Sequence, residues 1–476
     1  MKPNYINGAW VPGVAATPNV NPSDTNDIVD AYARGDAAAA RNAIGAARAA
    51  GEAWAHATPQ VRADALDAIG TELIARKQAL GELLAREEGK SLPEAVGEAA
   101  RAGQIFKFFA GEALRPGGEH LASLRPGVTV DITREPLGVV GIITPWNFPL
   151  GIPAWKIAPA LAHGNTVVFK PADLVPASAW ALTEIISRAG LPAGAFNLVM
   201  GRGREVGQAL LESRDVSGIS FTGSVATGKS VLMSAASRLA KVQMEMGGKN
   251  PLIVLEDADL DVAVECAVQG AYFSTGQRCT ASSRLIVDKR IHRRFVDALT
   301  VRLATLRIGD ARDPSTQIGP VVSEAQLQTD LDYIAIGREE GATLAFGGER
   351  LSRDTPGHYL SPALFVDAHN DMRIAREEIF GPVACVIAAD GYEHALALAN
   401  DTEFGLSAGI CTTSLKYANH FKRHAQAGMT MTNVSTAGGD YHVPFGGRKA
   451  SSYGAREQGR HAAEFYTTVK TSYVAA

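Results

Sequence analysis

Cys279 stands out among the side chains that can do covalent chemistry. It follows a glycine turn in Gly276-Gln277-Arg278-Cys279-Thr280, just beyond a stretch of helical character. A glycine turn exposes the side chain after it, and local backbone N–H groups can stabilise a developing oxyanion. Cys266, Cys385 and Cys411 lie instead on apolar runs, where a thiol usually acts as a small buried side chain. We therefore predict that Cys279 is a nucleophile.

Two other polar side chains have the right chemistry to assist a cysteine nucleophile. Glu245 lies between two methionines and beside the Gly247-Gly248 pair, so burial would raise its pKa toward the range of a general base. The alternative interpretation is that Glu245 is a glutamate at a helix end or in a surface salt bridge. Asn147 lies in Pro145-Trp146-Asn147-Phe148-Pro149, where two prolines fix a loop after a strand. Its amide can donate to an oxyanion, and its alternative is a turn-capping asparagine.

A parallel sheet is predicted to position these groups. Short β-rich runs alternate with helical stretches between Leu137 and Phe221, a pattern typical of strands joined by crossover helices. Ligands bind at the carboxyl ends of parallel strands. The expected strands cover residues 139–144, 166–170, 196–200 and 218–222, and the expected helices cover 152–162, 177–189 and 205–212.

The rest of the chain divides into three further regions. Alanine-rich sequence with charges at helical spacing predicts several amphipathic helices over residues 36–114. A second α/β region follows Pro251, with strands expected near residues 252–255, 285–287 and 384–387. Segments 115–135 and 465–474 alternate polar and apolar residues, which predicts the strands of a small arm that pairs across subunits.

A competing motif covers residues 223–230. Gly223-Ser224-Val225-Ala226-Thr227-Gly228-Lys229-Ser230 matches the P-loop pattern GxxxxGK[ST] and comes between a strand and a helix. The run from Leu252 to Asp257 would then supply an apolar strand ending in a magnesium-binding acid. A P-loop nucleotide triphosphatase is thus an alternative function, although it leaves the clusters around Trp146, Cys279 and Glu378 unexplained.

Composition sets limits on size, partners and location. A chain of 476 residues exceeds the size of one hydrophobic core, so two or three domains are expected. The 46 basic and 50 acidic side chains give a formal charge of −4, and this balance argues against nucleic acid as a partner. We see no secretory signal, no run long enough to span a membrane and no metal site. Four scattered cysteines favour a reducing, cytoplasmic location.

Several long motifs together resemble those of the aldehyde dehydrogenase superfamily. They occur in that family's order, and they cover nearly the whole chain, which makes the signal far more specific than a lone glycine pattern. The motifs are Thr144-Pro145-Trp146-Asn147-Phe148-Pro149, Trp155-Lys156-Ile157-Ala158-Pro159-Ala160-Leu161, Phe221-Thr222-Gly223-Ser224, Glu245-Met246-Gly247-Gly248-Lys249, Gly276-Gln277-Arg278-Cys279, Glu377-Glu378-Ile379-Phe380-Gly381-Pro382 and Pro444-Phe445-Gly446-Gly447.

The resemblance implies an α/β fold with three parts. A Rossmann-like NAD(P)-binding domain would comprise residues 1–114 and 137–247, and an α/β catalytic domain would comprise residues 248–446. A small β oligomerisation arm would comprise residues 115–136 and 447–476, giving a homodimer or a homotetramer. These boundaries agree with the regions that the sequence pattern distinguishes.

The resemblance also implies a role for each motif residue. Cys279 would attack the aldehyde, Asn147 and the Cys279 backbone N–H would hold the oxyanion, Glu245 would activate the hydrolytic water, and Lys156 would support cofactor or proton positioning. NAD or NADP would accept the hydride. The residues expected to bind that cofactor are Ile143, Thr144, Pro145, Trp146, Lys170, Asp173, Gly203, Gly207, Phe221, Gly223, Ser224, Glu378 and Phe380.

Two positions, Asp173 and Trp155, bear on the choice of cofactor and substrate. Asp173 stands where many NAD-preferring relatives carry glutamate, which leaves room for a 2′-phosphate, with Arg202 and Arg204 nearby. Trp155 stands where succinic semialdehyde dehydrogenases often have arginine, which weakens that substrate as an alternative.

The pattern from Phe273 to Arg284 and the run from His442 to Lys449 are similar to dehydrogenases of α-ketoglutaric semialdehyde (2,5-dioxopentanoate), so a small carboxylate-bearing aldehyde is the expected substrate. Arg278, beside the nucleophile, is the first candidate to bind that carboxylate, with a structural salt bridge as the alternative. A catalytically silent relative and a CoA-acylating enzyme are also conceivable. The presence of Cys279, Glu245 and Asn147 together argues against the first, and Glu245 against the second.

Overall fold

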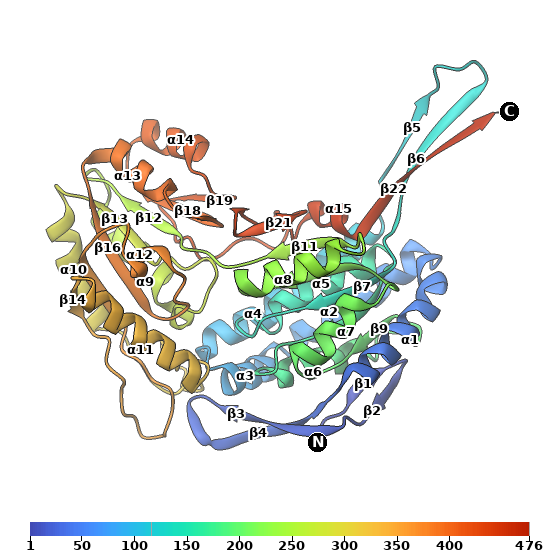
Figure 1. Ribbon diagram of the computed structural model, residues 1–476, viewed down its shortest axis with the longest axis horizontal. Helices are drawn as coiled ribbons and strands as arrows, with labels where there is room; N and C mark the ends of the chain where they lie inside the picture. Colours follow the sequence, from blue (N-terminus) through green and yellow to red (C-terminus); the bar gives the residue numbers. More distant parts are fainter. Residues whose placement is uncertain (116, 476) are drawn as a thin grey trace.

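Two separate β-sheets divide the chain, and a three-stranded arm projects from it (Figure 1). The structure is a computed structural model that describes residues 1–115 and 117–475. Pro116 and Ala476, which belong to the segments expected to form the arm, lie outside the described residues. Within the described part of the chain, no helix has the length and apolar character needed to cross a membrane.

The first sheet contains the parallel strands that the sequence predicts. Its strand order is β2-β1-β9-β8-β7-β10-β11-β21, and β7 to β11 are parallel to one another. The parallel strand β11 and the antiparallel strands β1, β2 and β21 at the two ends of the sheet were not predicted. The bounds are β1 Asn4–Ile6, β2 Ala9–Val11, β7 Val139–Ile143, β8 Thr166–Lys170, β9 Phe196–Leu198, β10 Val216–Thr222, β11 Lys241–Glu245 and β21 Ser452–Gly454.

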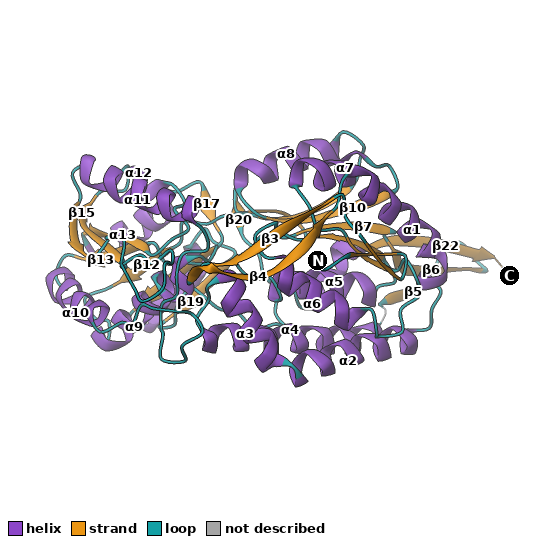
Figure 2. Cartoon of the chain, turned by 90° about the horizontal axis from the view of Figure 1, so that it is seen from below, coloured by secondary structure: helices purple, strands orange, loops and turns teal. Residues whose placement is uncertain are grey.

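Helices cover both faces of this sheet because its strands are apolar on both sides. Val140 and Ile142 of β7 pack into a core with α2 to α6, whereas Val139 packs into a core with α1, α7 and α8. Figure 2 shows these two helical layers on either side of the strands. The bounds are α1 Ala37–Ala55, α2 Pro59–Ala75, α3 Lys77–Glu88, α4 Leu92–Ala113, α5 Gly151–Ala162, α6 Pro176–Ile186, a π-helix Gly203–Gly207, α7 Gln208–Glu212 and α8 Val225–Ala236.

The second sheet forms its own layered unit. Its order is β14-β15-β16-β13-β12-β18-β19, and β14 is antiparallel to the rest. One core lies beneath α9 and α10, and a second lies beneath α11 to α14. The bounds are β12 Pro251–Val254, α9 Leu260–Ala271, β13 Arg284–Asp288, α10 His292–Ala304, α11 Glu324–Glu339, β14 Thr343–Phe346, β15 Ala363–Ala368, α12 Arg373–Arg376, β16 Val383–Ala389, α13 Gly391–Asn400, β18 Ser407–Cys411, α14 Leu415–His424 and β19 Met429–Thr432.

The arm is an antiparallel sheet in the order β22-β6-β5. β5 Gly118–Ala122 and β6 Val128–Pro136 fall within the predicted segment, and β22 Thr467–Ala475 pairs with β6 along its whole length. The arm is smaller at its C-terminal end than we expected. Residues 463–466 form the short helix α15 instead of a strand, because Phe465 and Tyr466 turn into the core of the first unit. Strand β21 pairs with β11 of the first sheet and does not belong to the arm.

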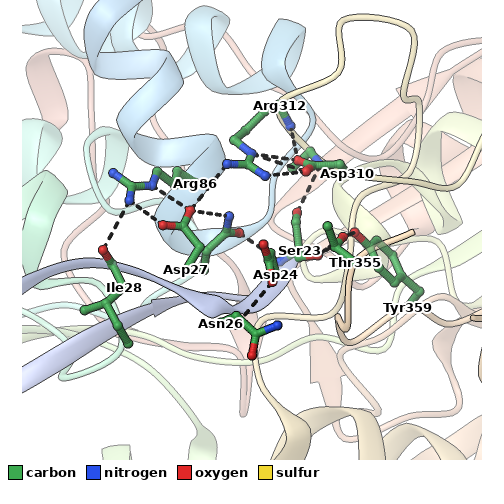
Figure 3. A network of polar contacts seen from close by, with 12 residues as sticks. Ser23, Asp24, Asn26, Asp27, Ile28, Arg86, Asp310, Arg312, Thr355 and Tyr359 are labelled. Carbon is green, nitrogen blue, oxygen red and sulfur yellow. Dashed lines mark hydrogen bonds and ion pairs between the residues drawn. The ribbon is translucent and has the colours of Figure 1, made fainter. Parts of the chain in front are cut away.

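A hairpin near the N-terminus connects the two sheet-bearing units. β3 Ala15–Asn21 pairs with β4 Asp24–Arg34, and its turn contacts residues of the second unit (Figure 3). Asp27 accepts from Arg86 of α3 at 2.8 Å and from Arg312 at 3.3 Å. The Ser23 carbonyl accepts from the Tyr359 hydroxyl at 2.7 Å. This polar network fixes the relative position of the units and therefore the geometry of any site between them.

Candidate active site

The carboxyl ends of four parallel strands lie side by side at one edge of the first sheet. Ile143 at the end of β7 is in register with Lys170 of β8 and Phe221 of β10, and Thr222 is in register with Glu245 of β11. The parallel register thus brings residues that are separated by up to a hundred positions to the same edge. This is the edge at which open α/β sheets bind ligands.

The cysteine loop has an unusual backbone that only a glycine completes. Ser274 and Thr275 have φ of 51° and 56°, and Gly276 follows with φ of 66°. A Cβ on Gly276 would collide with the Gly381 carbonyl, so no other residue fits there. Asn250 then holds the chain after this turn, because its Nδ2 donates to the carbonyls of Cys279 at 2.8 Å and Ala281 at 2.9 Å.

Asn147 reaches the cysteine loop from the first unit. Its Nδ2 donates to the Gln277 carbonyl at 2.9 Å, and Lys90 donates to the Asn147 backbone carbonyl at 2.6 Å. An amide nitrogen carries two hydrogens, so one remains for an oxyanion. The side chain of Cys279 is only partly buried in this loop. Burial, followed by the charges of Glu378 and Glu245, raises the pKa of its thiol to about 12.

Glu245 has the surroundings that the sequence predicts. It is 2% exposed at the end of β11, and Ser452 donates to its Oε2 at 2.6 Å. A Cβ on Gly446 would lie 2.7 Å from its other oxygen, so the glycine leaves room beside the carboxylate. Burial raises the pKa of Glu245 to about 8, opposed by the Ser452 hydrogen bond and raised further by Glu457. The carboxylate form of a group with this pKa can accept a proton from water near neutral pH.

Lys156 lies behind Glu245 in a fully buried polar cluster. Its Nζ pairs with Glu457 and donates to Ser220 at 2.8 Å and to Gln243 at 3.2 Å. Gln243 in turn donates to Glu245 at 3.4 Å, which connects the lysine to the candidate base. Burial raises the pKa of Glu457 above its ordinary value, opposed by Lys156.

Glu378 and Phe380 approach the site from the second unit. Glu378 accepts the Gly248 N–H at 2.8 Å, and burial raises its pKa to about 7. A side chain on Gly247 would collide with this carboxylate, which explains the glycine pair. The ring of Phe380 packs edge-on against Trp146 at 5.4 Å between centroids. These contacts bring two motifs from opposite ends of the chain to one place.

The residues expected to hold the cofactor fit a dinucleotide at the sheet edge. Ser224 caps α8 by accepting the Thr227 N–H at 3.3 Å, so the positive end of this helix points toward the edge. Added Cβ atoms on Gly203 and Gly207 would meet open space, which is what a close ligand requires. Lys170 pairs with Asp173 at 2.9 Å beside the end of β8.

The remaining predicted contacts lie along the same edge. Thr144 donates from its backbone N–H to the Lys170 carbonyl at 3.3 Å, and Pro145 and Trp146 follow it directly. The ring of Phe221 is buried beneath Gly223, where it would block a Cβ. The donors, the helix terminus and the open space therefore suit an adenine dinucleotide with a pyrophosphate and two riboses.

Arg278 does not have the role that we expected. Its guanidinium pairs with Glu94 of α4, and it also donates to the Ser274 hydroxyl at 2.8 Å. The side chain of Arg278 is 16% exposed, and its charge is already neutralised. These contacts support the structural salt bridge that was the alternative for Arg278, and the left-handed turn at Ser274 and Thr275 precedes this side chain.

The P-loop alternative is wrong. Its glycine loop follows β10 of the first sheet, whereas the apolar run at 252–255 forms β12 of the second sheet. A P-loop requires both elements at the edge of one sheet. Lys229 lies inside α8 with its side chain exposed, so the motif is a strand-to-helix turn with a serine cap.

Sequence reasoning missed several side chains that complete the site. Glu457, Gln243 and Ser452 surround Lys156 and Glu245, and Lys90 holds the Asn147 backbone. None of them lies within an unusual local pattern. Glu457 comes into contact with Lys156 across 301 positions, and the pairing of β21 with β11 helps to bring that end of the chain to the sheet.

A partly buried thiol near a buried carboxylate, facing a dinucleotide-type sheet edge, is typical of a cofactor-dependent oxidoreductase with a covalent step. The sequence profile of the Aldehyde dehydrogenase family matches residues 10–472. The chain is 44% identical to alpha-ketoglutaric semialdehyde dehydrogenase of Bacillus subtilis, with 99% of this chain and 97% of that protein covered. It is 41% identical to betaine aldehyde dehydrogenase of Mesorhizobium japonicum, with 99% and 96% covered.

The same similarity holds for solved structures. A betaine aldehyde dehydrogenase of Staphylococcus aureus in complex with NAD+ superposes with a TM-score of 0.97 at 34% identity, covering 100% of this chain and 95% of that one. The chain belongs to the aldehyde dehydrogenase family. It is an NAD(P)-dependent oxidoreductase that acts on aldehydes, and the predicted fold class is confirmed.

Proposed function

We propose that the protein oxidises α-ketoglutaric semialdehyde to 2-oxoglutarate through a thioester on Cys279. The observation that carries the mechanism is the convergence of Cys279, Asn147 and Glu245 on one site from three separate segments. The substrate is supported by the similarity to a relative that acts on this semialdehyde. Betaine aldehyde and succinic semialdehyde are the alternatives that an assay must separate.

Residues of the cysteine loop carry out the first half of the reaction. The Cys279 sulfur, as thiolate, adds to the aldehyde carbon, and the thiol proton passes to solvent or to a nearby carboxylate. The remaining Asn147 N–H and the Cys279 backbone N–H stabilise the oxyanion that forms. When bound, the nicotinamide cofactor supplies the acceptor for the hydride that leaves the same carbon. The oxyanion collapses as this hydride leaves, which yields the thioester.

The second half of the reaction belongs to Glu245. Its carboxylate takes a proton from water as the water oxygen attacks the thioester carbonyl. The carbon–sulfur bond breaks, which releases the carboxylic acid and restores Cys279. Lys156 and Glu457 form the buried charge pair behind Glu245 that sets the electrostatic potential at the base.

The residues expected near the adenosine ribose bear on the choice between NAD and NADP. Lys170 and Asp173 are paired there, and Arg202 lines the same cavity with its side chain exposed. We propose use of both NAD and NADP, because a short carboxylate and a nearby arginine accommodate a 2′-phosphate.

The exposed arm supports a homo-oligomer. It projects from the body of the molecule (Figure 1). Its apolar side chains Leu121, Val469 and Tyr473 are exposed. A second copy of the chain would cover them. Light scattering after size-exclusion chromatography distinguishes a dimer or tetramer from a monomer.

One assay tests the proposed activity. Reduction of NAD and NADP is followed by absorbance with α-ketoglutaric semialdehyde, succinic semialdehyde, betaine aldehyde and pentanal, with and without CoA. We expect the highest kcat/KM for α-ketoglutaric semialdehyde and no requirement for CoA. A higher kcat/KM for betaine aldehyde would contradict the proposed substrate.

A further inference from the structure

One face of α4 runs past the loops that surround Cys279. Glu94, near the start of the helix, accepts the backbone N–H of Ser274 in the cysteine loop at 3.2 Å. Glu98, one turn later, accepts the backbone N–H groups of Leu150 and Gly151, both at 2.9 Å, just after Asn147. The helix therefore contacts two of the segments that form the candidate active site.

The same face continues to a third segment, the loop of residues 433–447. Arg101, one turn after Glu98, donates to the Gly439 carbonyl of this loop. Two turns further along, the ring of Phe108 packs edge-on against Tyr441, with 6.1 Å between the centroids. Arg101 thus lies on the helix face that looks toward the site and not on the face that looks toward solvent.

Loop 433–447 is attached to the reacting groups at both ends. The Thr436 hydroxyl donates to the carbonyl of Thr280, the residue after Cys279, at 2.8 Å. At the other end, Gly446 lies against the Glu245 carboxylate, and Phe445 stacks on Trp155 at 5.3 Å. The middle of this loop, where Arg101 contacts it, therefore borders the approach to the nucleophile.

Arg101 differs from its neighbours on α4 in its charge balance. Glu94 is paired with Arg278, and Glu98 is paired with Lys90 at 2.6 Å. Among residues 1–115 and 117–475, no carboxylate lies within 4.0 Å of the Arg101 guanidinium. Burial lowers the pKa of Arg101, opposed by the more distant charges of Asp440 and Glu98. The guanidinium is consequently a partly desolvated cation with spare donors.

We infer that Arg101 binds the distal carboxylate of the aldehyde substrate and so selects acidic aldehydes. This inference rests on the proposed function, since that substrate carries a carboxylate at the end opposite its aldehyde. The planar fork of arginine suits a carboxylate, and the hydrogen bonds compensate for the hydration that the carboxylate loses on binding. The same charge repels the quaternary ammonium of betaine aldehyde. Arg101 takes the role that Arg278, paired with Glu94, does not have.

The test compares two substrates of equal carbon number, α-ketoglutaric semialdehyde and pentanal. In Arg101→Met we expect kcat/KM for the semialdehyde to fall by roughly ten- to a hundredfold, mainly through KM, as loss of a charge-assisted hydrogen bond implies. The value for pentanal should change little, and Arg101→Lys should recover part of the loss. Lys107→Met is the matched control, since it removes a positive charge from the same helix where Lys107 pairs with Asp67.

The possible outcomes separate this inference from the proposed function. If the parent enzyme does not prefer the semialdehyde over pentanal, the proposed substrate is wrong and the inference fails with it. If the parent shows the preference and Arg101→Met retains it, or loses both activities equally, only the role of Arg101 is overturned.

A second measurement uses glutarate, an unreactive dicarboxylate, as inhibitor of pentanal oxidation. Competition in the parent that is lost in Arg101→Met and partly retained in Arg101→Lys supports the inference, and equal competition in all three contradicts it.

Discussion

The thiol of Cys279 is held mainly in its neutral form by burial and by two nearby carboxylates. We predict that Cys279→Ser lowers aldehyde oxidation by several orders of magnitude, because a hydroxyl is a much weaker nucleophile without a strong base beside it. Cofactor binding should persist, since the first sheet and α8 hold the dinucleotide. Steady-state assay and fluorescence titration with NADH measure the two effects. Turnover near the parent rate would rule out the thioester mechanism.

Glu245 is predicted to limit the second half-reaction in a pH-dependent way. Its pKa is raised to about 8, and only the carboxylate form acts as a base, so deacylation should accelerate as the pH rises toward 8 and level off above it. In Glu245→Gln, acylation and hydride transfer should survive while deacylation slows. Rapid mixing should then show a burst of about one reduced cofactor per site. Steady multiple turnover at the parent rate would contradict this role.

The same residues show what local sequence can and cannot predict. The glycine turn before Cys279 and the methionines beside Glu245 are local signals; Gly276 does form a turn with positive φ, and Glu245 is buried. The direction of Arg278 was not predictable, because the left-handed turn at Ser274 and Thr275 is set by contacts with other segments. Arg101 lies in no recognisable sequence motif. Its contact with loop 433–447 depends on where that loop passes α4.

At the scale of elements, strand register determines which charges meet. The antiparallel pairing of β21 with β11 brings the segment containing Glu457 next to Gln243 and Glu245. Parallel strands β7, β8 and β10 were predictable from their apolar runs, whereas β1, β2 and β21 are too short to show a periodic pattern. Of the side chains that were not predicted, Gln243 and Ser452 lie on the short strands β11 and β21, whereas Lys90 and Glu457 lie outside the named helices and strands.

The buried pair behind Glu245 gives two variants with opposite expected effects. Glu457→Gln removes a charge that raises the pKa of Glu245, so the midpoint of the deacylation pH profile should fall by roughly half to one unit. Lys156→Met removes a charge that lowers that pKa, so the midpoint should rise. Single-turnover deacylation measured from pH 6 to pH 10 tests both. Movement in the same direction would indicate general distortion of the site instead of an electrostatic effect.

At the scale of the whole molecule, catalysis requires two independently packed units to stay aligned. Cys279 belongs to the second unit, whereas Asn147 and Glu245 belong to the first. The N-terminal hairpin contacts both units through the network around Asp27 and Ser23 (Figure 3). This network cannot be predicted from a local sequence motif, because its partners come from separate segments. They are residues 23–27, 86, 310–312 and 355–359.

Asp27 offers a test of how this alignment is maintained. The hydrogen bond from Arg86 lowers the pKa of Asp27 to about 2, so its stabilising contribution is complete above pH 4 and is lost as the pH falls toward 2. After allowance for solvent screening, we expect Asp27→Asn to destabilise the protein by about 1–2 kcal/mol at neutral pH. The difference in thermal midpoint from the parent should shrink between pH 4 and pH 2. Asp24→Asn is the control, since Asp24 accepts the backbone N–H of Asn26 in the same hairpin. An equal loss in both variants, or a loss independent of pH, would show that the ion pair does not fix the hairpin to α3.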